Sequence, residues 1–365
     1  MNTFGEKIKV TVFGQSHAEC IGAVIDGIPS GTPVDEEYVA KIMALRAPGN
    51  SPLATKRKEP DRVEFVSGVV GGRTVGSSIC AIIRNTDTHS KDYSDLINRP
   101  RPSHADYPAM VRYGESYDIR GAGQFSGRLT APICIAGAIA LPLLEKAGIK
   151  ISAHVLSVGN ISDKAFSLTE DETELMEKLS LMPFPVIDGE ASEKMVELVK
   201  KASAELDSVG GVIECKITGM PVGIGEPMFC GVENALSRMM FGIPAVKGIE
   251  FGAGFMGSTL YGSQYNDNYY YDENGKVRTR TNNAGGICGG MTTGMPIVFR
   301  VAIKPTPSIA RKQDTVDLAK KENTVLEIHG RHDPCIASRA SVVVRAATAF
   351  ALYDLIKCCD GMDIL

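Results

Sequence analysis

Two stretches of this 365-residue chain, 130–147 and 338–357, are predicted to form helices that are apolar on nearly every side. A helix without a polar face lies inside a protein rather than on its surface. Segments with alternating or β-branched residues, which are typical of strands, occur at 7–13, 21–26, 62–70, 77–84, 150–157, 210–218 and 295–304. Two buried helices among so many strands indicate a helical layer between sheets, in an α/β or α+β fold.

We expect one domain over residues 1–365, because no linker or low-complexity tract divides the chain. A chain of this length buries roughly three quarters of its unfolded surface, so one large core is available. The charged stretch 163–206 is interpreted as a peripheral helical excursion, since its run at 191–206 is amphipathic. Residues 85–128 are polar and rich in Gly and Pro, and a long irregular segment of this kind indicates a binding region.

Local signals predict two element boundaries. Asp35 is expected to cap a helix that runs to about Arg46, where Pro48-Gly49 stops it. Gly71-Gly72 is expected to form the turn between the two strands on either side of it.

The charge and the cysteine content argue against several classes of protein. The net charge is −4 and no long Lys/Arg block occurs, so nucleic acid is not expected as a partner. The nine cysteines are odd in number and form no Cys-x-x-Cys, which indicates a reducing compartment. No apolar secretory segment is evident at the N-terminus, and the stretches 131–143 and 346–352 are too short to span a bilayer. We therefore expect a cytoplasmic protein without a membrane partner.

Three of the six histidines lie in short segments flanked by Gly or Pro, which are typical of fixed turns. The segments are Gly-Gln-Ser-His at 14–17, Arg-Pro-Ser-His-Ala-Asp at 101–106 and Gly-Arg-His-Asp-Pro at 330–334. An imidazole beside a hydroxyl, guanidinium or carboxylate can place a proton donor near a bound anion. Each segment alone is equally compatible with an ordinary loop, but the three together favour an anion site.

Other segments could also bind an anion, but each of them has a structural explanation as well. The Gly-rich runs 121–127 and 284–290 could offer backbone N–H groups to a phosphate, or could simply allow close packing. Lys304-Pro-Thr-Pro-Ser308 could contact phosphate, or could be a plain exit from a strand. Arg46 at the end of a helix is explained equally well by the helix dipole.

Metal catalysis and serine hydrolysis are disfavoured. Arg331 stands among the would-be ligands His329, His332 and Asp333, and a guanidinium there opposes a divalent cation. No Gly-x-Ser-x-Gly nucleophile elbow lies near the histidines. The remaining hypothesis is a site where arginines hold phosphate and carboxylate, imidazoles protonate and one carboxylate acts as a base.

Taken in order, these segments resemble the chorismate synthase family over nearly the whole chain. The matching motifs are Phe13–His17, Asp26–Pro29, Asn85–Asp87, Arg101–Tyr107, Tyr117–Gly123, Ser126–Arg128, Ala245–Gly248, Ala284–Gly290, Lys304–Ser308 and Gly330–Pro334. The resemblance implies a β-α-β sandwich with a helical layer between two largely antiparallel sheets, usually assembled as a homotetramer. It also implies an anti-1,4-elimination of phosphate from 5-enolpyruvylshikimate 3-phosphate, which gives chorismate and needs reduced FMN without net redox change.

The resemblance further implies roles for single residues. His17 is implied as the acid beside the departing phosphate, His104 as a neighbour of flavin N1, and Asp333 as the base toward flavin N5. The implied substrate ligands are Ser16, Arg46, Arg128 and Arg331. The implied FMN ligands are Ser126, Ala245, Gly289, Lys304, Pro305, Thr306, Pro307, Ser308 and Arg331.

The chain departs from the family pattern in its charges. Gln15 stands where the family usually has glutamate, and Ala18 where it usually has glycine. Arginine is common in the family at three further positions, which are Ala47, Pro52 and Gln124 in this chain. Other arginines, such as Arg57, Arg99 or Arg101, could compensate. The alternatives are therefore a flavin-dependent oxidoreductase on the same scaffold and a non-catalytic flavin- or anion-binding protein.

The source of reduced FMN differs within the family. Some members reduce the flavin with NADPH themselves, and others depend on a separate flavin reductase. Because no nicotinamide motif is evident in this chain, the second arrangement is expected here.

Overall fold

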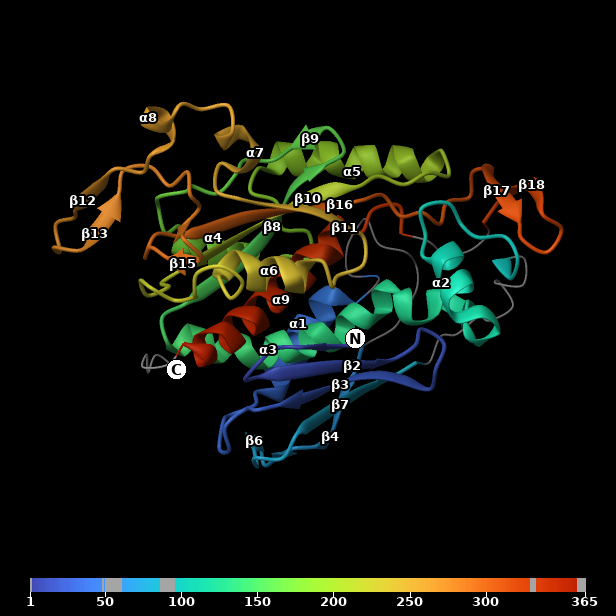
Figure 1. Ribbon diagram of the computed structural model, residues 1–365, viewed down its shortest axis with the longest axis horizontal. Helices are drawn as coiled ribbons and strands as arrows, with labels where there is room; N and C mark the ends of the chain where they lie inside the picture. The colour runs from blue at the N-terminus through green and yellow to red at the C-terminus, as the bar shows by residue number, and fades with distance from the viewer. Residues whose placement is uncertain (1, 48, 50–60, 86–95, 329–332, 360–365) are drawn as a thin grey trace.

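Two five-stranded antiparallel sheets form the outer layers of the molecule (Figure 1). The structure is a computed structural model that describes residues 2–47, 49, 61–85, 96–328 and 333–359. The first sheet has the order β1 (Thr3–Phe4), β2 (Lys9–Gly14), β3 (Cys20–Asp26), β7 (Ile79–Arg84), β4 (Val63–Ser67). The second has the order β11 (Val246–Phe251), β16 (Ile297–Ile303), β10 (Gly211–Thr218), β8 (Lys150–Val158), β9 (Ile161–Ser162).

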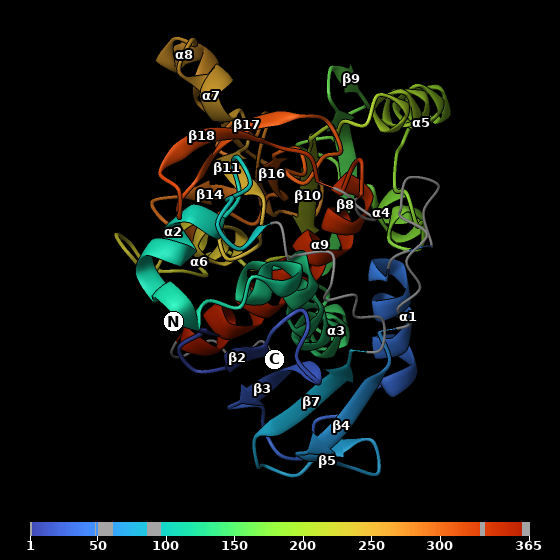
Figure 2. The ribbon, with the colours of Figure 1, turned by 90° about the vertical axis from the view of Figure 1, so that its right-hand side faces the viewer.

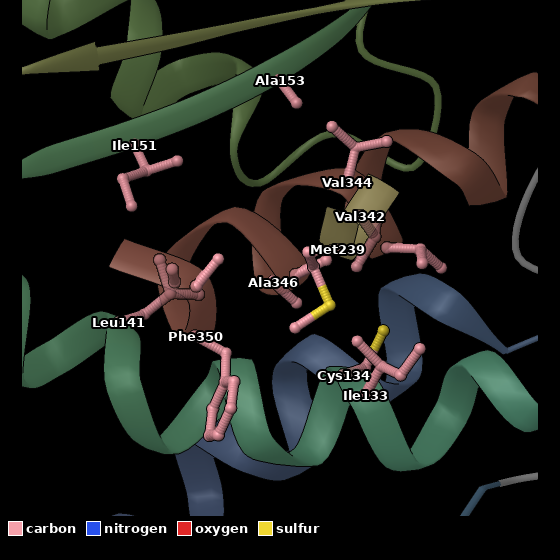
Figure 3. Close-up of a cluster of buried hydrophobic side chains, with 14 of the residues drawn as sticks. Ile133, Cys134, Leu141, Ile151, Ala153, Met239, Val342, Val344, Ala346 and Phe350 are labelled. Atoms are coloured by element: carbon pink, nitrogen blue, oxygen red, sulfur yellow. The ribbon is translucent and has the colours of Figure 1, made fainter. Parts of the chain in front are cut away.

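A layer of helices lies between the sheets and confirms the predicted fold class (Figures 1 and 2). It contains α3 (Thr130–Lys146) and α9 (Ala337–Cys358), with α1 (Glu36–Arg46) and α6 (Val232–Met240) beside them. Gly137 lets the two central helices approach closely, since a Cβ there would collide with the Ala346 carbonyl of α9. The apolar side chains of α3, α9, α6 and β8 meet in one core (Figure 3).

The stretch Arg120–Lys146 is long and apolar enough, by length and composition, to cross a membrane. This differs from the expectation that the apolar stretches are too short. However, 78% of its most apolar part is buried inside the protein, as in the core helix of a globular fold.

Helix α1 begins and ends as predicted. The side chain of its N-cap Asp35 accepts a hydrogen bond from the Tyr38 amide at 2.9 Å, and the helix ends at Arg46. The Gly71-Gly72 turn joins β5 (Val69–Val70) to β6 (Arg73–Thr74), and β4 pairs with β7.

The interpretation of residues 85–128 as irregular is wrong in part. Residues 86–95 lie outside the described residues, but α2 (Asp106–Tyr113) and short 3-10 turns occupy much of the remainder. Elements that the sequence did not predict include α6, β11, the hairpin β12 (Tyr269–Tyr271) with β13 (Val277–Thr279), and the hairpin β17 (Gln313–Asp317) with β18 (Glu322–Leu326). The two-stranded hairpins carry too few periodic residues to stand out. Helix α6 is amphipathic over nine residues and was missed despite that signal.

The segment expected as an excursion holds α4 (Thr173–Leu179) and α5 (Gly189–Ala204), near the second sheet (Figure 1). Helix α5 contacts β8 and β9 and buries only Met195 and Val199. We propose that the whole chain is one domain, because both sheets pack on the same helices.

A fully buried histidine ties this segment to the sheet. The two ring nitrogens of His154, on β8, lie 3.2 Å from an Asp163 carboxylate oxygen and 3.1 Å from a Glu214 carboxylate oxygen. The Phe166 amide also donates to Glu214, at 2.6 Å. Burial works to lower the pKa of His154, but the two carboxylates outweigh it and raise that pKa above 6.5.

Replacing His154 by glutamine is expected to lower the free energy of unfolding by about 1.5–3 kcal/mol at pH 6, the contribution of hydrogen bonds to charged groups. Because the pKa of His154 is higher in the folded state than in the unfolded state, the protonated ring stabilises the fold fully below pH 6.5. This stabilisation is lost as the pH rises through the folded-state pKa. The difference between wild type and variant should therefore shrink from pH 6 to pH 9 in urea unfolding. A difference that grows over this range would contradict the assignment.

Candidate active site

The turn that carries Ser16 and His17 follows β2 and rests on a glycine-rich loop. The Ser16 amide donates to the Gly123 carbonyl at 3.2 Å. Gly121 has φ 58°, and a Cβ there would lie 2.5 Å from Ser16 Oγ and 2.6 Å from His17 Cδ2. Only glycine suits this position, because it permits both the positive φ and the close approach.

His17 lies in the field of a carboxylate. The pKa of Asp118 is lowered, chiefly by its hydrogen bond from Arg120 and in smaller part by the charge of His17. The Asp118 carboxylate and the His17 ring therefore lie close enough for their charges to interact.

Asn85 connects this turn to Arg128. Its Nδ2 donates to the Gln15 carbonyl at 3.1 Å and to the Ala18 carbonyl at 2.8 Å. Its Oδ1 accepts from Arg128 Nε at 3.2 Å. Ser126 also belongs here, since its hydroxyl accepts from the Arg128 amide at the start of the turn that leads into α3.

Asp61 lies between Arg46 and Arg128 and pairs with both guanidinium groups. The three side chains are buried, with 0% of the Asp61 side chain exposed, 1% of Arg46 and 4% of Arg128. Burial works to raise the pKa of Asp61, but the two arginines outweigh it and hold that pKa below its usual range. Arg46 also donates to Thr130 Oγ1 and to the Gly127 carbonyl.

Arg339 extends this network to Asp333. Its Nη1 donates to Asp333 Oδ2 at 2.7 Å, and its Nε donates to the Arg46 carbonyl at 3.1 Å. We name the chain of contacts from the Gln15–Ala18 turn through Asn85, Arg128, Asp61, Arg46 and Arg339 to Asp333 the arginine network. It brings together Ser16, His17, Arg46, Ser126, Arg128 and Asp333. Arg331 and His332 lie outside the described residues.

A second cluster surrounds Asp106 at the start of α2. Arg101 donates to the two Asp106 oxygens at 2.6 and 2.8 Å, His104 Nδ1 lies 2.7 Å from Oδ1, and Tyr117 donates at 3.1 Å. Arg101 also donates to Ser308 Oγ at 3.2 Å. The residues that form the Asp106 cluster are Arg101, His104, Asp106, Tyr117 and Ser308.

His104 is held neutral in this cluster at pH 7. Burial lowers its pKa, the hydrogen bond with Asp106 acts in the opposite direction, and the charges of Arg101 and Lys304 lower it further. The net pKa is below 6.5. Because Nδ1 donates to the Asp106 carboxylate, Nε2 of the neutral ring is an acceptor.

The predicted cofactor residues fall into two groups. The Lys304 amide donates to the Ala245 carbonyl at 3.0 Å, and Lys304 Nζ donates to the Ser103 carbonyl at 2.9 Å, so Ala245 and residues 304–308 adjoin the Asp106 cluster. Gly289 lies in the turn between β14 (Ile287–Cys288) and β15 (Met291–Thr292). This turn precedes β16 whereas Lys304 follows it, so the seven-residue strand separates them by roughly 20 Å.

A separate pocket of about 380 Å³ is lined by Cys288, the residue before Gly289. It is lined by residues that include Tyr265, Asp267, Thr279 and Cys288. None of the residues of the arginine network or the Asp106 cluster lines it.

Residues 117–123 connect the two groups of the site. Tyr117 belongs to the Asp106 cluster, and Gly121 and Gly123 hold the Ser16–His17 turn. The site thus offers two imidazoles, buried guanidinium groups and a carboxylate. Among the described residues no group of His, Cys, Asp or Glu could hold a metal ion. The arrangement suits binding of an anion and transfer of protons.

Sequence reasoning missed several residues of the site. No function was predicted for Asp61, Asn85 or Arg339, although each of them contacts a residue that was predicted to act in the site. Asp106 lay in the predicted segment 101–106, but the three residues that donate to it are spread between positions 101 and 117. The one available signal for Arg339 was a charged residue near the start of a largely apolar helix.

The chain is similar to known chorismate synthases. A family model described as chorismate synthase matches residues 8–356. The chain is 44% identical over 351 residues to a chorismate synthase of Korarchaeum cryptofilum, covering 96% of each chain. It is 44% identical over 363 residues to one of Methanocaldococcus jannaschii, covering 97% of this chain and 96% of the relative. A crystal structure of a chorismate synthase matches with a TM-score of 0.75 at 28% identity, over 99% of this chain and 94% of that chain.

Proposed function

The chain belongs to the chorismate synthase family, and we propose that the arginine network and the Asp106 cluster form its active site. It is a carbon–oxygen lyase that eliminates phosphate from 5-enolpyruvylshikimate 3-phosphate to form chorismate. One observation carries the assignment of the site. Contacts between segments far apart in the sequence join a hydroxyl–imidazole turn, two buried arginines and a carboxylate in one network.

Residues of the arginine network bind and protonate the substrate in this proposal. Arg46 and Arg128 hold its anionic groups, together with Arg331, and Ser16 donates a hydrogen bond. His17 donates a proton to the departing phosphate, a role supported by its place beside Ser16 on the turn that Asn85 links to Arg128. Asp333 accepts a proton. The low exposure of both arginines strengthens charge-assisted hydrogen bonds by excluding water.

The residues around the Asp106 cluster fit a flavin mononucleotide. Among the described residues, the buried Thr306 Oγ1 has no hydrogen-bond partner. Lys304 stands two residues before it, and Ser308, two residues after it, accepts a hydrogen bond from Arg101. An orphaned hydroxyl in a segment that carries one cation and binds another suits a phosphate group. We propose that Ser126, Ala245 and residues 304–308 hold reduced FMN, together with Arg331. Bound there, reduced FMN supplies electron density that helps phosphate depart without net redox change.

His104 completes the proposed cofactor site. Its neutral ring presents Nε2 as an acceptor, held in place by the Nδ1 bond to Asp106. Such a group can hold or accept one proton at the flavin N1 position.

We propose that the chain forms a homotetramer and that an exposed arm contributes to the contacts between subunits. Helices α7 (Gly254–Gly257) and α8 (Gly262–Tyr265) project from the body (Figures 1 and 2), and the β12–β13 hairpin projects beside them (Figure 1). This arm exposes Phe255, Met256, Tyr261, Tyr269 and Tyr271, each by more than two thirds of its surface. Large exposed apolar groups of this kind mark interaction surfaces. In an oligomer Gly289, which is remote from the Asp106 cluster within one chain, can reach the FMN of a neighbouring subunit.

We further propose a cytoplasmic protein that receives reduced FMN from a separate flavin reductase. Free cysteines support a reducing compartment. No observation favours the oxidoreductase alternative.

Cofactor dependence tests this proposal. With 5-enolpyruvylshikimate 3-phosphate under anaerobic conditions, chorismate should form with dithionite-reduced FMN and should not form with oxidised FMN alone. Oxidised FMN with NADPH should also give no product unless a flavin reductase is added. Product with NADPH alone would show that the chain reduces its own flavin, and chorismate formed without any flavin would refute the cofactor assignment.

A further inference from the structure

Arg339 lies in the first turn of α9 and binds two groups with one planar side chain. Nη1 donates to the Asp333 carboxylate at 2.7 Å, and Nε donates to the Arg46 carbonyl at 3.1 Å. Arg46 is the last residue of α1, so its carbonyl has no partner within that helix. One guanidinium therefore joins the proposed base to the helix end that carries a proposed substrate ligand.

The position of Arg339 is unfavourable for a cation. The first turn of a helix is the positive end of its dipole, which repels a guanidinium. Only 22% of the side chain is exposed, and both burial and the charge of Arg46 lower the pKa of Arg339. A neutral apolar residue would match the rest of α9 at lower cost to stability.

We propose that Arg339 is a positioning residue that fixes the orientation of the Asp333 carboxylate relative to Arg46. This inference rests on the proposed function, because it takes Asp333 as the base. A guanidinium holds two acceptors in fixed directions, whereas the ammonium group of lysine is a point charge without a planar fork. Arg339→Lys should therefore keep the positive charge but preserve only part of the orientation of the Asp333 carboxylate.

The test measures kcat, KM for 5-enolpyruvylshikimate 3-phosphate, and the Kd of reduced FMN. Arg339→Met should lower kcat about 10²-fold, which is the loss expected when a reacting group is misplaced by about 1 Å. KM and Kd should stay within about threefold of wild type. Arg339→Lys should lie between Arg339→Met and wild type. In the Asp333→Asn background, Arg339→Met should change kcat by less than about threefold, since a residue that acts through Asp333 has nothing left to orient.

Arg345 provides a matched control on the same helix. It is also partly buried, but it donates to the carbonyls of Ile151 and Ser180 and to Tyr38, away from the arginine network. Arg345→Met should lower thermal stability without the loss of kcat.

The outcomes separate this inference from the proposed function. If Asp333→Asn lowers kcat but Arg339→Met leaves it within about threefold of wild type, the positioning role alone is wrong. It is also wrong if Arg339→Met lowers kcat as strongly in the Asp333→Asn background as in wild type. If Asp333→Asn leaves kcat unchanged, the role of Asp333 fails and the positioning role fails with it.

Discussion

His17→Ala is expected to lower the rate of chorismate formation about 10²–10⁴-fold, the usual contribution of a positioned acid or base. The imidazole is the group of the Ser16–His17 turn that can protonate a departing phosphate, and Gly121 leaves room for it, since a Cβ there would lie 2.6 Å from His17 Cδ2. Asp333→Ala should cause a loss on the same scale. Binding of reduced FMN, followed by fluorescence titration, should stay near normal in both variants.

A matched histidine variant controls for loss of folding. His154→Gln removes a fully buried imidazole from the polar cluster of the second sheet, away from both parts of the site. It should lower stability and leave kcat within about twofold of wild type. Near-normal turnover in both His17→Ala and Asp333→Ala would remove their assigned roles.

Asp61→Ala is expected to have the largest effect on stability of any single change in the site. It leaves Arg46 and Arg128 as buried cations without their shared carboxylate, and breaking such a pair costs about 3–5 kcal/mol. That is a large share of the roughly 5–15 kcal/mol that stabilises a domain. Urea unfolding at pH 7 measures the loss.

The pH dependence of this effect has a definite sign. The pKa of Asp61 is lower in the folded state than in the unfolded state, so its stabilisation is present above about pH 4 and fades as the pH falls through the folded-state value. The difference in the free energy of unfolding between wild type and Asp61→Ala should therefore become smaller at acidic pH. Glu64→Ala is the control, because its exposed pair with Arg84 contributes at most about 1 kcal/mol. Equal losses in the two variants at pH 7 would contradict the role of Asp61.

The helical core was predictable because its signal is local. Helices α3 and α9 are apolar over four or more turns, and Asp35 marks the start of α1 within three residues of the amide it caps. Strand β11 was missed, since Gly248 and a register shift between Val246 and Gly248 interrupt its alternation. Periodicity reveals elements only where it is unbroken.

The candidate site was predictable only in part. Single segments hold His17 beside Ser16 and His104 beside Asp106, so the sequence indicated them. The partners of Arg46 were not predictable, because Asp61 follows it by 15 residues and Arg339 by 293. The contact with Arg339 depends on the packing of α1 against α9, which no local pattern contains.

The departures from the family motif also have a structural explanation. Gln15 and Ala18 stand where glutamate and glycine are usual, yet both are tied to Asn85 through their backbone carbonyls. Those bonds do not depend on the side chains, so the Ser16–His17 turn keeps its link to Arg128. Pro52 and Arg57 lie outside the described residues.

An anaerobic stoichiometry measurement tests the central claim most directly. Enzyme, dithionite-reduced FMN and 5-enolpyruvylshikimate 3-phosphate are mixed, and chorismate, phosphate and flavin absorbance are followed together over many turnovers. An elimination predicts equal amounts of chorismate and phosphate with no net oxidation of the flavin. Flavin oxidised in proportion to product, or phosphate released without chorismate, would contradict it.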